Sequence, residues 1–405
     1  MTTKLHLPGD RDYDLHRAAH SPTVDSRPAM IVEAMEPADI GLAVTTANDL
    51  DLPFAVQATG HGTWQPADHG VLLKTGNLSD VRIDPQRRIA TVGPGARWGA
   101  VLSAAARYGL VGLAGSSPDV GVVGYTLGGG MGWLARRYGL AADSVLAAEV
   151  VTADGRTITA TPDRHPDLFW ALRGGGGNFG VVASLQFRLY PVSQVFTAVA
   201  TYPIEAAAEV LDRYRGWAQA APDSASTAVV LGGNGVVVKA MSTDLTGRAL
   251  RPLWTAAGQV ERRVSGFAEA KMGGVRALHQ DFFHRLTDSD IATIIAAHRE
   301  NGTTVEVRHW GGAIAAAVPD AGPAGHRSTP FSVTLDNPGS HLPTGIGAVF
   351  YNFLGDPSRV DDAFTTQNLG RLREVKRAYD PTNFFHINHN ITPAPAAAAL
   401  AAVTT

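Results

Sequence analysis

The chain has 405 residues, 45% hydrophobic and 18% charged, so it can bury sizeable cores and form two or three domains. Its net charge of −3 argues against nucleic acid or an anionic membrane as the main partner. The absence of cysteine excludes disulfides, thiolate metal sites and cysteine nucleophiles. No segment has the apolar length of a signal peptide or a membrane span, so we expect a cytoplasmic protein.

The first half of the chain mixes strand and helix patterns. Residues 1–28 are polar and irregular, and we interpret them as an N-terminal extension. Within residues 29–192, helical patterns are expected near 36–47 and 98–108, and a hairpin over 81–92. Short strands mixed with helices predict an α/β or α+β domain in this part of the chain.

The second half has longer apolar strand patterns. Residues 193–360 are predicted to form a substrate-binding domain with an antiparallel sheet covered by helices, including a strand at 347–353. A helix expected over 366–379 belongs to a separate C-terminal segment, 361–393. The Ala-rich residues 394–405 are expected to form a flexible tail.

Three glycine-rich stretches stand out between the first strands and Gly180. The first, at residues 58–63, reads Ala-Thr-Gly-His-Gly-Thr, and the others span 121–132 and 174–180. Glycine allows backbone N–H groups to approach a phosphate closely, whereas in a helix interior it costs about 1 kcal/mol per site. A flexible loop or close helix packing remains an alternative for the second stretch, and a helix cap for the third. Together the three stretches predict a large nucleotide cofactor held mostly by backbone.

Six segments give the chain a family resemblance. They span residues 58–61, 92–95, 115–121, 126–130, 167–180 and 379–391. Together they resemble the flavoprotein superfamily of vanillyl-alcohol oxidase and para-cresol methylhydroxylase (PCMH), and within it the berberine-bridge-enzyme-like branch. The resemblance runs over residues 29–393. It implies a PCMH-type FAD-binding domain of two subdomains at 29–192, followed by the substrate domain and a C-terminal segment that returns to the cofactor.

The resemblance also implies FAD as the cofactor, with its pyrophosphate on the loop that carries His61. In such proteins this histidine is usually bonded to the flavin 8α-methyl group, which makes the flavin a stronger oxidant. Ser117 stands where many relatives have a second, cysteinyl link, so we expect a single link to His61. The positions that match cofactor contacts are Ala58, Thr59, Gly60, His61, Gly62, Thr63, Leu78, Gly93, Gly95, Ser117, Val120, Gly121, Gly124, Tyr125, Gly128, Asn178, Gly180, Val182, Asn352, Asn388 and Asn390.

The family pattern breaks at the catalytic base. Relatives often use the tyrosine of a Tyr-x-Asn segment, but here Phe350 holds that position and Tyr351 is one residue away. On a strand, Tyr351 would face the opposite side unless a bulge turns it inward. Another group could serve instead, or no base is used. We take Tyr351 and His309 as catalytic candidates, with His326 as a further imidazole. No metal site is expected, because no closely spaced ligand set appears.

The favoured function is that of an FAD-dependent oxidase. It would remove a hydride from a C–H bond next to oxygen or nitrogen in an alcohol, sugar-like or secondary-metabolite substrate, and pass the electrons to O₂. The alternative, motivated by Phe350, is a biosynthetic FAD enzyme that catalyses a cyclisation or another step without acting as an oxidase. A binding protein without activity is a third hypothesis, and the sequence leaves the oligomeric state open.

Overall fold

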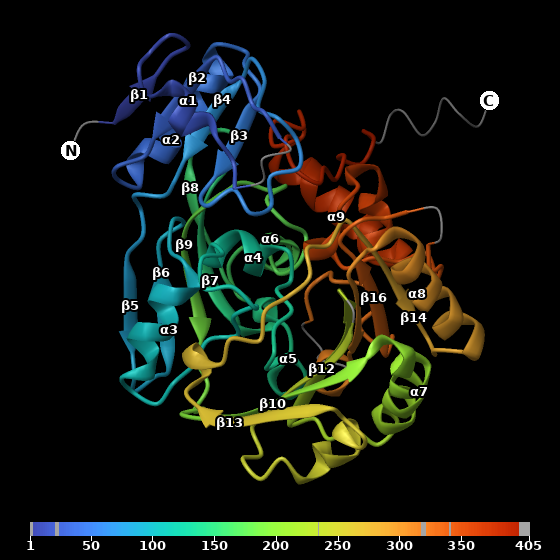
Figure 1. Ribbon diagram of the computed structural model, residues 1–405. Helices are drawn as coiled ribbons and strands as arrows, with labels where there is room; N and C mark the ends of the chain where they lie inside the picture. The colour runs from blue at the N-terminus through green and yellow to red at the C-terminus, as the bar shows by residue number, and fades with distance from the viewer. Residues whose placement is uncertain (1–2, 21–23, 234, 317–320, 340–341, 397–405) are drawn as a thin grey trace.

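A computed structural model of the protein describes residues 3–20, 24–233, 235–316, 321–339 and 342–396. Three sheets organise the molecule, two in the N-terminal half and one in the C-terminal half (Figure 1). This confirms the predicted α+β fold. Within the described ranges, no helix combines the length and the apolar character that crossing a membrane requires.

The first sheet has the strand order β1-β2-β4-β3. Its strands are β1 (Lys4–His6), β2 (Met30–Glu33), β3 (Phe54–Gln57) and β4 (Val71–Lys74), and helix α2 (Ala38–Asp49) packs on it. Strands β2 and β3 run parallel to β4, and β1 is antiparallel to β2. Helix α1 (Tyr13–Arg17) follows β1. The prediction that residues 1–28 are irregular was therefore wrong, because β1 completes the edge of this sheet.

The second sheet is antiparallel, with the order β5-β6-β9-β7-β8. Its strands are β5 (Val81–Asp84), β6 (Ile89–Val92), β7 (Val145–Val151), β8 (Thr157–Ala160) and β9 (Val181–Arg188). The helices of this region are α3 (Trp98–Ala106), α4 (Val122–Leu127), α5 (Ala135–Tyr138) and α6 (Pro166–Leu172). The expected hairpin over 81–92 is confirmed, and the expected helix from residue 98 ends two residues early.

The third sheet forms the C-terminal half and is antiparallel throughout, in the order β13-β10-β12-β11-β15-β16-β14. Its strands are β10 (Val195–Pro203), β11 (Ala225–Gly232), β12 (Gly235–Ser242), β13 (Gln259–Ser265), β14 (His279–Phe283), β15 (Val305–His309) and β16 (Phe331–Leu335). Helices α7 (Ala207–Ala218) and α8 (Asp288–Asn301) cover one face (Figure 1). The opposite face is turned towards the N-terminal half, which confirms the predicted one-sided helical cover.

The predicted strand at 347–353 is wrong. Residues Tyr351–Phe353 form a short 3-10 helix, and the stretch before it has no strand partner among the described residues. Two backbone bonds join this region to β14, from Ile346 N to Phe282 O at 2.9 Å and from Phe282 N to Ala348 O at 3.1 Å. Side chains of β14 add two more: Gln280 Oε1 accepts from Phe350 N at 2.7 Å, and Asp281 Oδ1 accepts from Ala348 N at 3.2 Å. Because side-chain oxygens of β14 accept from the N–H groups of Ala348 and Phe350, a regular backbone ladder does not form along this apolar stretch.

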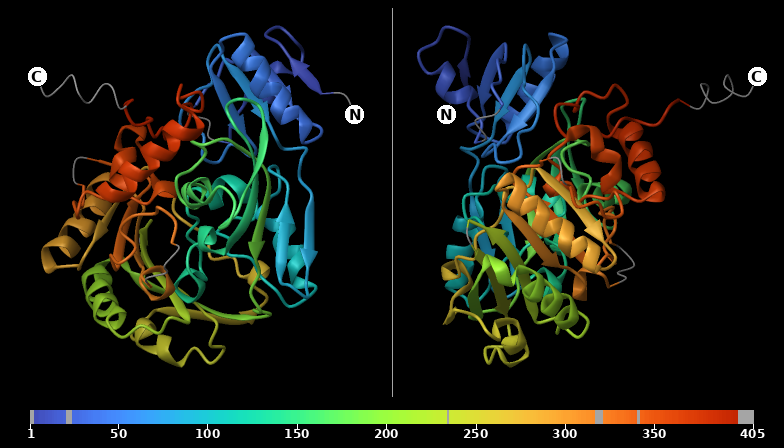
Figure 2. Two further views of the ribbon diagram at one scale, coloured as in Figure 1. Left: turned by 180° about the vertical axis from the view of Figure 1, so that it is seen from behind. Right: turned by 45° about the vertical axis from the view of Figure 1, so that its right-hand side comes forward.

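The C-terminal segment closes the fold. Helix α9 (Thr366–Tyr379) has the bounds expected from sequence, and residues after it return to the first sheet (Figure 2). There, Phe384 stacks on Phe54 with ring centroids 5.1 Å apart. Residues 397–405, most of the expected tail, lie outside the described residues.

Candidate functional site

The loop that carries His61 follows directly from β3. Gly60 has a φ of +77°, and a Cβ there would lie 2.7 Å from Gln57 Nε2 and 2.8 Å from His20 N, so only glycine fits this turn. The imidazole of His61 is half-buried and stacks on His20, with ring centroids 3.7 Å apart. Burial, followed by His20 and Arg97, lowers the pKa of His61. The ring is therefore neutral at pH 7 and keeps the nitrogen lone pair that bond formation to an electrophile requires.

Two more loops meet this one. A Cβ on Gly121 would lie 3.4 Å from Thr59 Oγ1, and Arg97 forms an isolated β-bridge with Gly121. Arg97 and Asp119 face each other with 3.7 Å between Nη1 and Oδ1. They line a cavity of 360 Å³ together with Gly76, Ser79, Gly95, Gly99, Ala100 and Pro118. Ser117 and Val120 lie in the same loop as Pro118 and Asp119, so the structure brings several predicted contact residues to the edge of this cavity.

Several predicted cofactor glycines have a packing reason of their own. A Cβ on Gly93 would lie 2.2 Å from the carbonyl oxygen of Leu78, and one on Gly95 would lie 2.3 Å from Thr75 O. A Cβ on Gly128 or Gly180 would collide with Asn352 or Val150. By contrast, Cβ atoms on Gly62 and Gly124 would meet no other residue within 4 Å, which leaves room for a ligand.

The C-terminal segment reaches the His61 loop. Gln65 Nε2 donates to the carbonyl oxygen of Asn388 at 2.6 Å, and Trp64 stacks near His389. The amide oxygens of Asn388 and Asn390 are buried, and no hydrogen-bond partner is found for them among the described residues. Buried acceptors of this kind normally have a donor. A cofactor that offers N–H groups, as FAD does, would supply it, so these residues fit the expected group.

Asn178 ties the third glycine loop to the C-terminal segment. Its Nδ2 donates to Gly175 O at 2.9 Å and to His389 O at 3.0 Å, while its Oδ1 accepts from Ile391 N at 2.9 Å. Its side chain is fully used inside the protein. Val182 is likewise buried in strand β9. A cofactor contact through either residue stays a prediction.

Tyr125 and Asn352 lie together at the second glycine loop. Asn352 Nδ2 donates to Tyr125 O at 3.1 Å, and its Oδ1 accepts from Gly130 N at 2.8 Å. The Tyr125 hydroxyl is buried without a partner among the described residues. Asn352 therefore fixes the loop, and the Tyr125 hydroxyl is a free polar group beside it.

Tyr351 is a packed residue in this structure. Its hydroxyl donates to His389 O at 3.2 Å and accepts from Asn178 Nδ2 at 3.4 Å. Burial raises the pKa of its hydroxyl, although the bond from Asn178 opposes the shift. A phenol that is hard to ionise is a weak candidate for a base at neutral pH.

Replacing Tyr351 with phenylalanine should leave the rate at which substrate bleaches the flavin almost unchanged. Loss of a general base would instead reduce that rate by about 10²–10⁴-fold. The free energy of unfolding should fall by about 1 kcal/mol, because one hydrogen-bonding hydroxyl is removed. Stopped-flow absorbance and urea unfolding separate the two roles, and a large loss of rate would identify Tyr351 as catalytic.

His309 lies on the helix-covered face of the third sheet. Strand alternation puts it on the same side as Val305 and Val307, and its ring packs against Trp217 and Phe331. Burial and the nearby Arg136 lower its pKa to about 3. Its role as a catalytic base stays a prediction, but its position separates it from the opposite face.

The His309→Phe variant should lose less stability in acid than the unaltered protein. The pKa is about 3 in the folded protein and about 6.5 in an unfolded chain, so between these values the unfolded chain binds the extra proton. Stability from neutral His309 is therefore complete above pH 6.5 and is lost as the pH falls. Between pH 6.5 and 4.5 the difference amounts to about 2–3 kcal/mol. Urea unfolding at both pH values measures this difference in stability. The His284→Ala variant, altered at an exposed histidine, should behave like the unaltered protein. Equal dependence of stability on pH in the His309→Phe and unaltered proteins would contradict the low pKa of His309.

The opposite face of this sheet carries a charged cluster that the sequence analysis missed. Glu306 and Arg308 form a buried ion pair at 2.9 Å. The guanidinium of Arg308 also lies 4.8 Å from the Trp133 ring centroid, and the half-buried Lys239 donates to Met272 O at 2.8 Å. Lys239 in β12 and Arg308 in β15 lie on either side of β11, where Ala228 is opposite both of them. The sequence did contain a signal for this cluster, because Glu306 and Arg308 occupy alternate positions of the strand pattern at 304–308.

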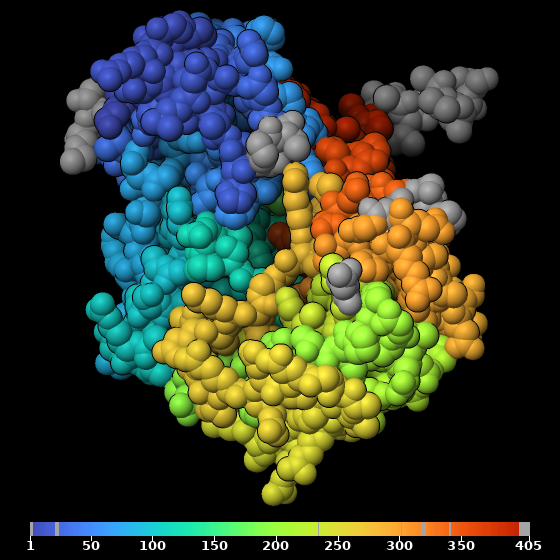
Figure 3. Space-filling view, viewed as in Figure 1, coloured from blue at the N-terminus to red at the C-terminus, as the bar shows by residue number. Residues whose placement is uncertain are grey.

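The segment between β13 and β14 crosses a hollow between the two halves of the molecule (Figure 3). The carbonyl oxygen of Met272 in this segment accepts from Lys239 Nζ. Gly274 lies close to Ser116, because a Cβ on this glycine would lie 3.3 Å from Ser116 Oγ. Ser116 in turn accepts from Trp133 Nε1 at 3.1 Å. The segment therefore links the charged cluster to the loop that carries Ser116 and Ser117.

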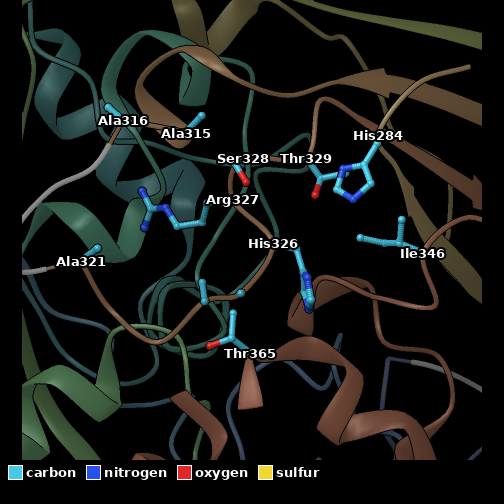
Figure 4. A pocket seen from close by; sticks show the side chains of 12 residues that line it. His284, Ala315, Ala316, Ala321, His326, Arg327, Ser328, Thr329, Ile346 and Thr365 are labelled. Atoms are coloured by element: carbon cyan, nitrogen blue, oxygen red, sulfur yellow. The ribbon is translucent and has the colours of Figure 1, made fainter. Parts of the chain in front are cut away.

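His326 lies elsewhere, beside a separate cavity of 470 Å³. Figure 4 shows it with His284, Ser328 and Thr329 around this cavity. Arg327 makes a bidentate ion pair with Asp143, at 2.8 and 2.6 Å, which links the lining of this cavity to the N-terminal half. The cavity does not include any residue that we predicted to bind the cofactor.

Comparisons with known proteins agree with this architecture. Residues 28–161 match the family described as "FAD binding domain", and residues 349–392 match "Berberine and berberine like". An FAD-linked oxidoreductase of Bacillus subtilis is 27% identical over 97% of both chains. The (R)-6-hydroxynicotine oxidase of Paenarthrobacter nicotinovorans is 36% identical over 42% of this chain, although the matched part is only 38% of that protein.

Solved structures show the same fold. The 6-hydroxy-D-nicotine oxidase of Arthrobacter nicotinovorans superposes with a TM-score of 0.85 at 24% identity, over 97% of this chain and 98% of that one. The berberine-bridge-enzyme-like protein 1 of Physcomitrella patens gives a TM-score of 0.89 at 20% identity, over 97% of each chain. The predicted PCMH-type α+β fold, with an antiparallel sheet covered by helices in its second half, is confirmed.

Proposed function

We propose that this chain, which matches the FAD-binding and berberine-like family models, is an FAD-dependent oxidase of the berberine-bridge-enzyme-like family whose flavin is linked to His61. When bound, the flavin supplies a hydride acceptor for a substrate carbon, and O₂ is the proposed acceptor of the electrons. The chain's own part is to bind the cofactor, hold the substrate and keep water away from the reacting carbon.

The convergence of the His61 loop with the C-terminal segment supports this proposal most strongly. The Gln65–Asn388 bond joins two segments separated by 323 residues. It brings a neutral imidazole and the buried amide oxygens of Asn388 and Asn390 into one region. A cofactor reaching from the imidazole to these acceptors would satisfy buried polar groups that otherwise lack partners, which is a stabilising arrangement.

The proposed substrate wall is the charged cluster of Lys239, Glu306 and Arg308. The Glu306–Arg308 pair is neutral as a unit, and Lys239 adds one positive charge beside it. Hydrogen-bonding side chains on a buried wall orient a polar small molecule, because an unpaired donor there costs free energy. We propose an alcohol, sugar-like or secondary-metabolite substrate with oxygen or nitrogen next to the reacting carbon. Proteins of similar fold include oxidases named for chitooligosaccharide and 6-hydroxy-D-nicotine.

Replacing His61 with alanine is expected to release the flavin from acid-precipitated protein. The unaltered protein should give a yellow pellet, whereas the variant should give a colourless pellet and a yellow supernatant, because its only covalent bond is missing. The His20→Ala variant is the matched control, since it removes the stacked neighbour at 3.7 Å but keeps the bonding imidazole. A yellow pellet from the His61→Ala protein would refute the histidyl link.

A second function is favoured by the environment of Tyr351. Its hydroxyl is committed to His389 and Asn178, so a tyrosine base of the usual family type is not free here. A biosynthetic step such as a cyclisation, without net transfer of electrons to O₂, fits that observation. Measuring hydrogen peroxide against product distinguishes the two functions: one peroxide per product indicates an oxidase, and product without peroxide indicates the alternative.

A further inference from the structure

Three side chains from separate elements meet at the outer edge of the first sheet. His6 lies in β1, His16 in α1 and Glu33 in β2. His6 Nε2 lies 2.7 Å and His16 Nδ1 lies 3.3 Å from the same carboxylate oxygen, Oε1 of Glu33. The two imidazole rings stack with centroids 4.0 Å apart, and each has a nitrogen near the same carboxylate oxygen. All three potential ligand atoms lie within 4.8 Å of one another.

The surroundings hold the carboxylate in place for a ligand. Asn77 Nδ2 donates to the second oxygen of Glu33, Oε2, at 3.1 Å, so Oε1 remains directed at the histidines. Hydrogen bonds to the outer oxygen of a ligating carboxylate are typical of metal sites. The side chains of His6, His16 and Glu33 are 13%, 26% and 11% exposed, so the cluster is sheltered but open to water on the His16 side. Lys74 is opposite Glu33 in the β2–β4 register, and its charge partly offsets that of the carboxylate.

We propose that His6, His16 and Glu33 bind a divalent transition-metal ion, of which Zn²⁺ is the best match. Two imidazoles and one carboxylate form a ligand set that Zn²⁺ uses, with a fourth position left for water. The hard ions Ca²⁺ and Mg²⁺ prefer oxygen ligands and are disfavoured by two nitrogens. Zinc ligands lie about 2.0–2.2 Å from the ion and therefore about 3.4 Å from one another, so the His6–Glu33 contact of 2.7 Å has to widen to admit the ion.

This site would fasten the N-terminal arm, residues 3–20, to the FAD-binding half. Strand β1 has only three residues and α1 only five, so neither element is stable by itself. The same arm supplies the carbonyl of Ala18, which accepts from Gln57 Nε2 at 3.0 Å, and His20, which stacks on His61. A metal at the cluster would therefore steady the segment that lies against the proposed flavin-linking histidine.

Zinc titration of the purified, FAD-loaded protein without a polyhistidine tag tests the site. Calorimetry and metal analysis should give about one tightly bound zinc per chain for the unaltered protein. The His16→Ala variant should lose this binding; because His16 is partly exposed, its removal should leave the fold intact. The His284→Ala variant, altered at an exposed histidine outside the cluster, should bind zinc as the unaltered protein does.

Limited proteolysis gives a second measurement that does not depend on activity. At a free zinc concentration ten times the dissociation constant, opening of the arm becomes about tenfold rarer, and cleavage before residue 30 should slow by that factor. The Glu33→Gln variant keeps the size and planar shape of the side chain but removes the negative charge, so its cleavage rate should respond much less to zinc. Equal zinc binding by the unaltered and His16→Ala proteins, or cleavage that zinc does not slow, would overturn the proposal, whether or not the protein proves to be an oxidase.

Discussion

Replacing Asp380 with alanine is expected to lower the free energy of unfolding by about 3–5 kcal/mol. Asp380 and Lys376 are both fully buried, and their charged atoms lie 2.6 Å apart. Lys376 Nζ also donates to Asn178 O at 2.8 Å and to Phe385 O at 3.0 Å. Asp380 accepts from the backbone N–H groups of Phe384 and Phe385 at 2.7 and 2.8 Å. Its removal leaves a buried cation and two unpaired donors at the joint between the third glycine loop and the C-terminal segment.

The pH dependence of this variant identifies the cause. Burial lowers the pKa of Lys376 below its usual value, and Asp380 opposes that shift. Without Asp380 the folded-state pKa falls further, so the unfolded chain binds more protons at alkaline pH. The stability of the Asp380→Ala protein should then rise as the pH increases towards the usual lysine pKa, about 10.4. Urea unfolding at pH 7 and 9.5 measures the change.

Two companion variants complete this experiment. In the double variant Lys376→Met with Asp380→Ala, part of the lost stability should return, because the uncompensated charge is gone. The exposed pair of Arg373 and Asp361, at 2.7 Å, provides the control, and Asp361→Ala should cost about 0–1 kcal/mol. A cost for Asp380→Ala as small as that of the control would show that the buried pair is not a main support of the C-terminal segment.

The glycine loops and helix α9 could be predicted because their signals are local. The sequence around His61 specifies a tight turn by its own residues, and Gly60 indeed has a positive φ. Helix α9 begins after Thr365, whose hydroxyl accepts from Asn368 N, and its periodic pattern stops before Pro381. Such features need no knowledge of distant partners, so the reading from sequence and the structure agree on them.

The remaining site residues depend on register and on partners far along the chain. Arg308 and Lys239 become neighbours only through the pairing of β15, β11 and β12, which no single strand pattern reveals. His309 was a reasonable base by residue type, but the alternation of β15 turns it towards α7 and α8. The cluster of His6, His16 and Glu33 was missed for the same reason, since β1 pairs with β2 across an arm that looked irregular.

Gly176→Ala is the second substitution with a large expected effect, a loss of about 2–5 kcal/mol of unfolding free energy. Gly176 has a φ of +73°, which costs an alanine about 1–2 kcal/mol. A Cβ there would also lie 2.0 Å from the Tyr351 hydroxyl oxygen, so the ring or the loop must move. Thermal and urea unfolding of the holoprotein measure the loss.

The two contributions to this loss can be separated by comparison with nearby variants. In a Tyr351→Ala background the clash disappears, so Gly176→Ala should cost only the backbone part of about 1–2 kcal/mol. The adjacent Gly177→Ala is the matched control: no atom of another residue lies within 4 Å of its added Cβ, and it should change stability by less than about 1 kcal/mol. Similar losses at both glycines, or no recovery in the Tyr351→Ala background, would contradict the packing of Tyr351 on this loop. Recovery would place Tyr351 as the residue that fixes the third glycine loop against the C-terminal segment, where its ring and hydroxyl have no freedom to approach a substrate.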